Sequence, residues 1–149
     1  MRKLTEKGTL LVELLIVIGV LGLLLTISVP YIRNSISNIR LANSAKDIVI
    51  YIRNSQQLTV SEQTHYDAEI IDAEQKYKIV KASDNSVIRE TGLPSEIIFS
   101  EINGFTGDKI SFNYYGAAIE TGTILLLNTA TNKTAVIEVK PSGYVNYSL

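Results

Sequence analysis

The sequence predicts an α+β protein in which one long N-terminal helix packs on an antiparallel β-sheet domain. Three observations predict this fold: an apolar run near the N-terminus, an amphipathic segment directly after it, and many short β-type segments in the remaining chain. The chain has 149 residues, of which 46% are hydrophobic, and its formal net charge is −1. We expect four consecutive regions, with the boundaries 1–8, 9–30, 31–62 and 63–149.

The apolar run covers residues 9–29, and Glu13 is its only charged residue. As a helix these 21 residues measure about 31 Å, which is enough to cross the hydrocarbon core of a bilayer once. The preceding residues 1–8 are polar and net positive, so the positive-inside rule places this end in the cytoplasm and the C-terminus outside. Region 9–30 is therefore expected to be a transmembrane helix, which Pro30 kinks rather than ends.

Region 31–62 has the pattern of an amphipathic helix that continues the apolar one. Its apolar residues mostly recur three or four positions apart, with charged residues on the other sides. We expect this stripe to face the chain's own β domain rather than an external partner. The stripe consists of Ile32, Ile36, Ile39, Leu41, Ala45, Ile48 and Ile52.

Region 63–149 consists of short segments of β type separated by turn residues. In residues 76–81, for example, Tyr77 and Ile79 alternate with lysines, as in a half-buried strand. This spacing indicates hairpins and antiparallel sheet. The expected strands are 66–71, 76–81, 87–90, 97–100, 110–114, 123–128, 134–139 and 144–147.

The composition excludes most catalytic and metal-binding classes. The chain has no cysteine, which excludes disulfides and thiolate sites, and its single histidine, His65, is expected to be a surface or turn residue. The carboxylates within 67–74 alternate with apolar residues, as on a solvated strand face. Residues 104–108 contain two glycines without the following Lys-Ser/Thr of a phosphate loop. We expect no enzyme activity, no metal, no cofactor and no small-molecule substrate.

The eight tyrosines are the remaining candidates for contact with a partner. Tyr114, Tyr115, Tyr144 and Tyr147 could present rings to another protein or to single-stranded DNA. No basic cluster accompanies them, so a DNA contact is not supported and we expect these rings to pack on the sheet.

The apolar run has three interpretations: a plain membrane anchor, a cleaved secretory signal peptide, or a segment with a further role. A signal peptide needs small residues at its cleavage site, and residues 26–28, Thr-Ile-Ser, imitate that pattern poorly. A plain anchor does not explain Glu13, because an ionised carboxylate inside a bilayer costs about 2.5–3.5 kcal/mol on insertion scales. Glu13 could, however, reach back to the interface, since it lies only one turn into the run.

Residues 7–18, Lys-Gly-Thr-Leu-Leu-Val-Glu-Leu-Leu-Ile-Val-Ile, resemble the class III signal of type IV pilins and pseudopilins. The resemblance implies a leader peptide, residues 1–8, that a prepilin peptidase removes by cutting between Gly8 and Thr9. The same enzyme would N-methylate Thr9, and Glu13 would then be the fifth residue of the mature chain. Thr9 departs from the family, which most often has phenylalanine there.

The resemblance also gives roles to three residues farther along the helix and to Glu13. Glu13 would neutralise the N-terminal ammonium of a neighbouring subunit and so set the axial register, because a paired charge costs less than two unpaired ones. Gly19 and Gly22 each destabilise a helix by roughly 0.5–1 kcal/mol, which would permit local melting in a fibre or allow close helix packing. Pro30 lies where helices of this family commonly carry a proline.

Features of residues 44–60 and of the C-terminal strands resemble the GspH/FimT-type branch of minor pseudopilins, and the lack of cysteine suits the Gram-positive competence (ComGD) group. The resemblance implies a subunit of a type IV pilus or pseudopilus for DNA uptake or protein secretion. Its partners would be the peptidase, the membrane and other pilin subunits. The chain would lie in the cytoplasmic membrane first and in a surface fibre after assembly. The alternative is a membrane-anchored extracytoplasmic binding domain that never assembles.

Overall fold

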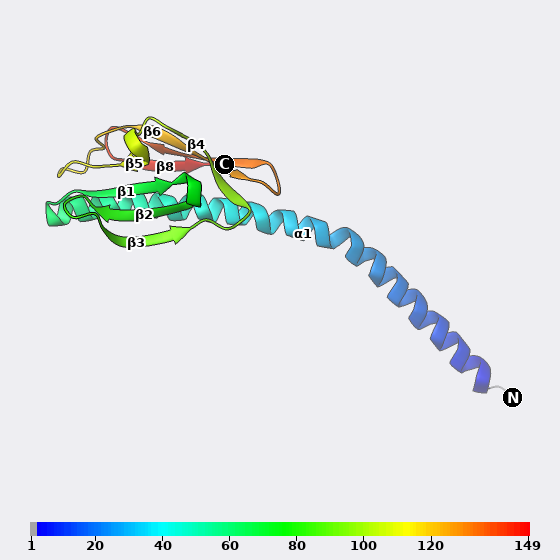
Figure 1. The fold of residues 1–149 in the computed structure, drawn as a ribbon. Coiled ribbons are helices and arrows are strands. Elements are labelled where there is room, and N and C mark those ends of the chain that lie inside the picture. The colour runs from blue at the N-terminus through cyan, green and yellow to red at the C-terminus, as the bar shows by residue number, and fades with distance from the viewer. Residues whose placement is uncertain (1–2) are drawn as a thin grey trace. The chain divides into compact units, whose positions relative to one another are not determined.

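The computed structural model describes the backbone of residues 3–149 and the side chains of residues 9–26, 32 and 34–149. The chain divides into two compact units, Met1–Ile36 and Ser37–Leu149, and each is described by itself. One helix, α1 (Lys3–Glu62), forms the described part of the first unit and begins the second. All strands belong to the second unit (Figure 1).

The β domain consists of eight strands and two short 3-10 turns, η1 (Asp72–Glu74) and η2 (Thr106–Asp108). The strands are β1 (Tyr66–Ile71), β2 (Lys76–Lys81), β3 (Ser86–Gly92), β4 (Ile97–Asn103), β5 (Lys109–Ile110), β6 (Gly122–Asn128), β7 (Lys133–Val139) and β8 (Val145–Ser148).

The strands form two four-stranded sheets, with the orders β3-β2-β1-β5 and β4-β6-β7-β8. Every pairing is antiparallel. The predicted α+β class, a long helix with an antiparallel β domain, is therefore confirmed. The strands expected at 66–71 and 76–81 form at those residues.

The core of the second unit lies between the C-terminal half of α1 and the strands (Figure 1). The helix contributes Leu41, Ala45, Ile48 and Ile52, which are all almost completely buried. These four positions recur at the helical spacing of four and three, so they form one apolar face. The sheets contribute mainly isoleucine, leucine and valine, together with Phe112, which is fully buried.

The expectation that the whole apolar stripe of region 31–62 faces the β domain is wrong for Ile39, which is 56% exposed although it lies in the same unit as the strands. Ile32 and Ile36, in the first unit, are 54% and 45% exposed. The reason is a change of phase: Leu41 follows Ile39 by only two residues, which turns the stripe by about 200° around the helix axis. The sequence therefore contains two stripes, and only the second faces the core.

The strand expected at 110–114 is also wrong in its extent. The strand β5 ends at Ile110, and Phe112 forms only an isolated bridge with Ala118. The Asn113 side chain accepts hydrogen bonds from the backbone N–H groups of Tyr115 and Ala117, at 3.0 Å each. These bonds stabilise a turn in place of a continued strand.

Candidate functional site

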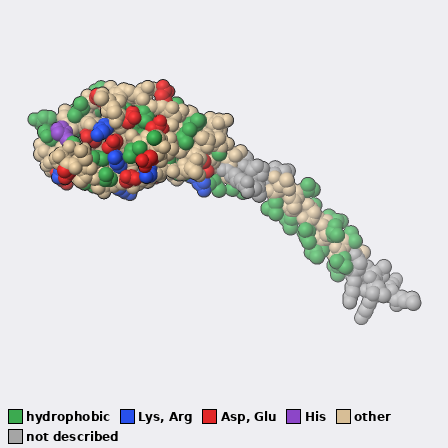
Figure 2. All heavy atoms as spheres, viewed as in Figure 1, with side chains coloured by type: hydrophobic (Ala, Val, Ile, Leu, Met, Phe, Trp, Pro, Cys, Tyr) green, Lys and Arg blue, Asp and Glu red, His purple; other side chains and the backbone are tan. Residues whose placement is uncertain are grey.

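The apolar part of α1 is the first candidate site. Residues Thr9–Thr26 are apolar and long enough to cross a membrane, and none of them is buried within the chain. Figure 2 shows this succession of hydrophobic side chains along the helix, outside the grey residues. Individual leucines are as exposed as Leu11 (69%) and Leu15 (72%). Since burying each such side chain is worth about 1.5–3 kcal/mol, an apolar partner outside the chain would stabilise this segment strongly.

Glu13 lies on this exposed segment, four residues after Thr9 and therefore one helical turn away. Within the described part of the chain, Glu13 has no hydrogen-bond or ion-pair partner.

Gly19 and Gly22 lie farther along the same exposed segment. A Cβ atom added at either glycine would meet nothing within 4 Å, so no contact within the described chain requires a glycine there. The Thr26 hydroxyl donates a 2.8 Å hydrogen bond to the Gly22 backbone carbonyl. Side-chain bonds of this kind slightly destabilise a helix and often bend it. The α1 helix continues through Pro30. Gly8 and Pro30 lie outside the residues whose side chains are described.

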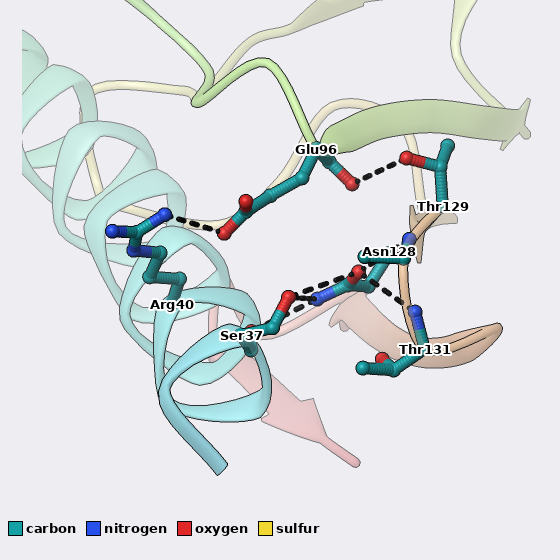
Figure 3. Close-up of polar contacts among 7 residues, drawn as sticks. Ser37, Arg40, Glu96, Asn128, Thr129 and Thr131 are labelled. Carbon is teal, nitrogen blue, oxygen red and sulfur yellow. Dashed lines mark hydrogen bonds and ion pairs between the residues drawn. The ribbon is translucent and has the colours of Figure 1, made fainter. Parts of the chain in front are cut away.

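A buried polar contact holds α1 at the first residue of the second unit. The Asn128 amide donates hydrogen bonds of 2.9 Å to the carbonyl and to the hydroxyl oxygen of Ser37, and both residues are buried (Figure 3). Asn128 Oδ1 accepts the backbone N–H groups of Ala130 and Thr131, so the same side chain also fixes the β6–β7 turn. Because every polar group of the Asn128 side chain is satisfied, this contact can be buried without a large penalty.

An ion pair adds to this contact on the solvent side. Arg40 Nη1 lies 2.9 Å from Glu96 Oε1, and the Glu96 backbone carbonyl accepts a 3.1 Å hydrogen bond from the Thr129 hydroxyl (Figure 3). The Arg40 side chain is about half exposed. We therefore assign the pair a modest contribution, about 0.2–1 kcal/mol, and treat Ser37–Asn128 as the principal anchor.

A second set of contacts holds α1 nearer its C-terminal end. Gln56 Nε2 donates to the carbonyls of Gly116 (2.6 Å) and Gly143 (3.1 Å), which joins two turns to the helix. Gly143 has a φ of +79°, and a Cβ there would lie 1.9 Å from the Gly116 carbonyl oxygen. Only glycine fits this position. Arg53 Nη2 donates a 2.6 Å hydrogen bond to the Val145 carbonyl.

Tyrosines complete the contacts of this helix with β1 and β2. The Tyr66 hydroxyl donates to the Glu62 carboxylate, and this hydrogen bond raises the pKa of Tyr66 above its ordinary value. Tyr77 packs edge-on against Tyr51, with ring centroids 4.6 Å apart. Burial, with a smaller contribution from the Asp47 carboxylate, raises the pKa of Tyr77 to about 12. Both phenols therefore stay neutral at physiological pH, as packing residues require.

The expectation that the tyrosines of the turns pack on the sheet is wrong for three of them. Tyr114, Tyr115 and Tyr144 are 39%, 95% and 53% exposed, whereas Tyr147 packs partly buried against the core. The Tyr114 ring stacks on His65, with centroids 4.5 Å apart, and His65 Nδ1 lies 3.2 Å from the Phe112 carbonyl oxygen. His65 is therefore part of a turn contact, as expected.

The carboxylates of 67–74 have structural partners. Glu69 and Glu74 form ion pairs with Lys78 (3.3 Å) and Lys76 (2.9 Å). Figure 2 shows charges of both signs interspersed over the face where Figure 1 places β1, β2 and β3. This arrangement is the solvated strand face that the alternation of residues predicted.

Sequence reasoning missed the residues that fix α1 to the β domain. Ser37 and Asn128 are 91 positions apart, and Gln56 lies 60 and 87 positions from its two glycine partners. One local signal was available for Asn128, because an asparagine at the end of an apolar strand, before Thr-Ala-Thr-Asn, is typical of a side chain that caps a turn.

Comparison with known proteins identifies the fold. No protein-family model matches the chain, and no curated protein matches its sequence. The solved structure of the type IV minor pilin FimU of Pseudomonas aeruginosa matches with a TM-score of 0.61 at 12% identity, over 75% of this chain and 90% of that one. The minor pseudopilin EpsH from the Type 2 Secretion System of Vibrio cholerae matches with a TM-score of 0.61 at 8% identity, over 73% of this chain and 96% of that one. The chain thus has the fold of minor pilins and pseudopilins.

The anchor predicts a specific loss of stability. We expect Asn128→Ala to lower the free energy of unfolding of the second unit by about 2–3 kcal/mol, because it leaves the buried Ser37 hydroxyl and two backbone N–H groups without their partner. The measurement is thermal unfolding followed by near-UV circular dichroism, which reports the buried tyrosines, with the full chain in lipid nanodiscs. Asn43→Ala, at an exposed position of α1, is the matched control and should change the midpoint little. Equal midpoints for the two variants would contradict the role given to Asn128.

Proposed function

We propose that this chain is a minor pilin-like subunit that is inserted in the membrane as a single-pass precursor and later assembled into a pilus or pseudopilus. The observation that carries the proposal is the apolar segment Thr9–Thr26, which has no buried residue in a chain with the fold of minor pilins. A membrane covers such a segment before assembly, and the apolar helices of other subunits cover it afterwards. Extraction from lipid then never exposes the segment to water.

Processing is the first step of the proposal. The basic leader 1–8 keeps the N-terminus in the cytoplasm, where a prepilin peptidase cuts between Gly8 and Thr9 and methylates the new terminus. Cleavage creates an ammonium group at Thr9, at the edge of the apolar segment. The regions 1–8, 9–30, 31–62 and 63–149 are then leader, assembly helix, amphipathic helix and β domain.

Charge pairing is the second step. Glu13 neutralises the ammonium group of a neighbouring subunit, because two opposite charges in a medium of low dielectric constant are far less costly together than apart. The absence of a partner for Glu13 within the described chain supports this role. Pairing at one position of an otherwise uniform apolar surface fixes how far neighbouring helices are displaced along the fibre axis.

Residues that weaken α1 would permit the helix to change its length on assembly. Gly19 and Gly22 weaken the helix by roughly 0.5–1 kcal/mol each, and Pro30 removes one backbone donor. Since no contact of the described chain requires glycine at positions 19 and 22, their role is either local melting or close approach of a second helix. The exposed isoleucines 32, 36 and 39 continue the apolar surface that other subunits would cover. Assembly of this kind would serve either DNA uptake or protein secretion, and a separate ATPase would supply the energy.

Processing predicts the N-terminus of the mature chain. Protein sequencing or mass spectrometry of the chain isolated from its native host should find N-methylated Thr9 as the first residue. A Gly8→Ala variant should remain as the precursor, because the glycine before the cut is the demanding position in the family. A mature chain that begins at Met1 would instead support a membrane-anchored binding domain that never assembles.

The charge pair predicts a defect in assembly without a defect in processing. We expect Glu13→Gln and Glu13→Ala to be cut normally but to enter fibres at least about tenfold less, because the ammonium group of the neighbouring subunit loses its partner. A loss of about 1.4 kcal/mol in the free energy of assembly corresponds to a factor of ten. Immunoblots of the membrane fraction and of the sheared surface fraction measure both steps. Glu101→Gln, which removes a carboxylate charge at an exposed position of β4 outside the apolar segment, is the matched control. Normal incorporation of both Glu13 variants would rule out the pairing.

A further inference from the structure

An exposed tyrosine lies beside a hollow in the β domain that the assembly proposal does not use. Tyr115 is 95% exposed, the highest value among the large hydrophobic side chains that the structure describes. The hollow has a volume of about 480 Å³, within the range of small-ligand pockets. It lies between α1 and the 113–117 turn, and its lining consists of Arg53, Gln56, Gln57, Val60, Ser61, Tyr115 and Gly116.

The turn that carries Tyr115 is held rigidly. Asn113 Oδ1 accepts the backbone N–H groups of Tyr115 and Ala117, and the Gly116 N–H donates to the Asn113 carbonyl at 2.9 Å. Gln56 on α1 in turn holds the Gly116 carbonyl at 2.6 Å. A ring on such a turn is presented to solvent at little further cost in conformational entropy, which is the property of an aromatic binding residue.

The remaining lining offers neutral hydrogen-bonding groups and one fixed cation. The Gln57 amide is exposed and has no hydrogen-bond partner within the described chain, so it can both donate and accept. The Arg53 guanidinium uses one N–H group on the Val145 carbonyl and lies 5.8 Å from the centre of the Tyr144 ring, which leaves other N–H groups for a ligand. Val60, 39% exposed, extends the apolar surface next to Tyr115.

This combination fits a neutral sugar better than a nucleic acid. One face of a pyranose ring consists of C–H groups that pack on the electron-rich face of an aromatic ring, and its hydroxyls suit amide and guanidinium partners. A nucleic-acid strand carries one negative charge per nucleotide and needs a track of cations, whereas Arg53 is the only charged residue among the described residues that line the hollow. No carboxylate in the described lining would favour a cationic ligand.

We propose that the hollow bounded by Tyr115, Gln57 and Arg53 binds one or two rings of an uncharged polysaccharide, with Tyr115 as the stacking platform. Tyr115 packs on the C–H face of the sugar, Gln57 and Arg53 bond its hydroxyls, and Val60 covers an apolar substituent such as an acetamido methyl group. The inference concerns the β domain alone and does not depend on cleavage at Gly8 or on pairing by Glu13.

Saturation-transfer difference NMR tests this proposal with the full chain in lipid nanodiscs, because alkyl-maltoside detergents would themselves offer a sugar. The probes are maltohexaose and tetra-N-acetylchitotetraose at millimolar concentration. We expect transfer to the C–H protons of at least one probe, and a dissociation constant that rises about tenfold or more in Tyr115→Ala, as for the loss of a stacked ring. Tyr115→Phe keeps the ring and should keep binding.

Ile119→Ala is the matched control, because Ile119 is 58% exposed and does not line the hollow. Circular dichroism of each variant verifies that its fold is intact. The proposal is overturned if neither sugar receives saturation, or if transfer is the same in Tyr115→Ala. It is also overturned if an oligothymidylate binds through Tyr115 while the sugars do not.

Discussion

The structure depends on one constraint: a long helix carries an apolar segment that the described residues of its own chain leave uncovered. Every residue of Thr9–Thr26 lies outside the buried core, although the same helix buries Leu41, Ala45, Ile48 and Ile52 completely or nearly so. Water is an unfavourable solvent for such a segment, and the proposed function surrounds it with lipid before assembly and with other apolar helices afterwards. A helix satisfies its backbone hydrogen bonds internally and can therefore exchange one apolar environment for the other.

A helix that changes its surroundings can carry the β domain with it only if it cannot slide or detach within that domain. An apolar face alone fixes register weakly, because hydrophobic contacts have no direction. Directional contacts lie at both ends of the embedded half of α1: the buried Ser37–Asn128 hydrogen bonds at one end, and Gln56 with its two glycine turns at the other. Force applied to the helix would thus be transmitted to both β6–β7 and the C-terminal turns.

Most of the architecture could be predicted from periodicity, because the apolar run, β1 and β2 each satisfy a local rule of spacing or alternation. Which part of the amphipathic stripe meets the core could not. The two-residue step from Ile39 to Leu41 places them on different faces of the helix, and only packing reveals that the face of Leu41 is the buried one. Likewise, the exposure of Tyr115 depends on a turn that the Asn113 side chain stabilises, whereas the residue pattern predicted a strand over 110–114.

The candidate site divides in the same way. The order of residues 7–18 carries a resemblance to a processing signal, and that signal stays a prediction. The anchor residues are distant in sequence and belong to ordinary polar types, so no local pattern marks Ser37 or Gln56. The Asn128 side chain forms hydrogen bonds with both α1 and the β6–β7 turn, an arrangement that exists only once the sheet packs on the helix.

The proposed function requires the helices of other subunits to cover the exposed apolar segment in a fibre. The most direct measurement places a photoreactive phenylalanine analogue at Leu15, which is 72% exposed, and irradiates cells of the native host. We expect a covalent product, in the sheared surface fraction, between this position and the apolar helix of another pilin-like subunit. A chain found only in the membrane fraction, and cross-linked only to lipid, would contradict it.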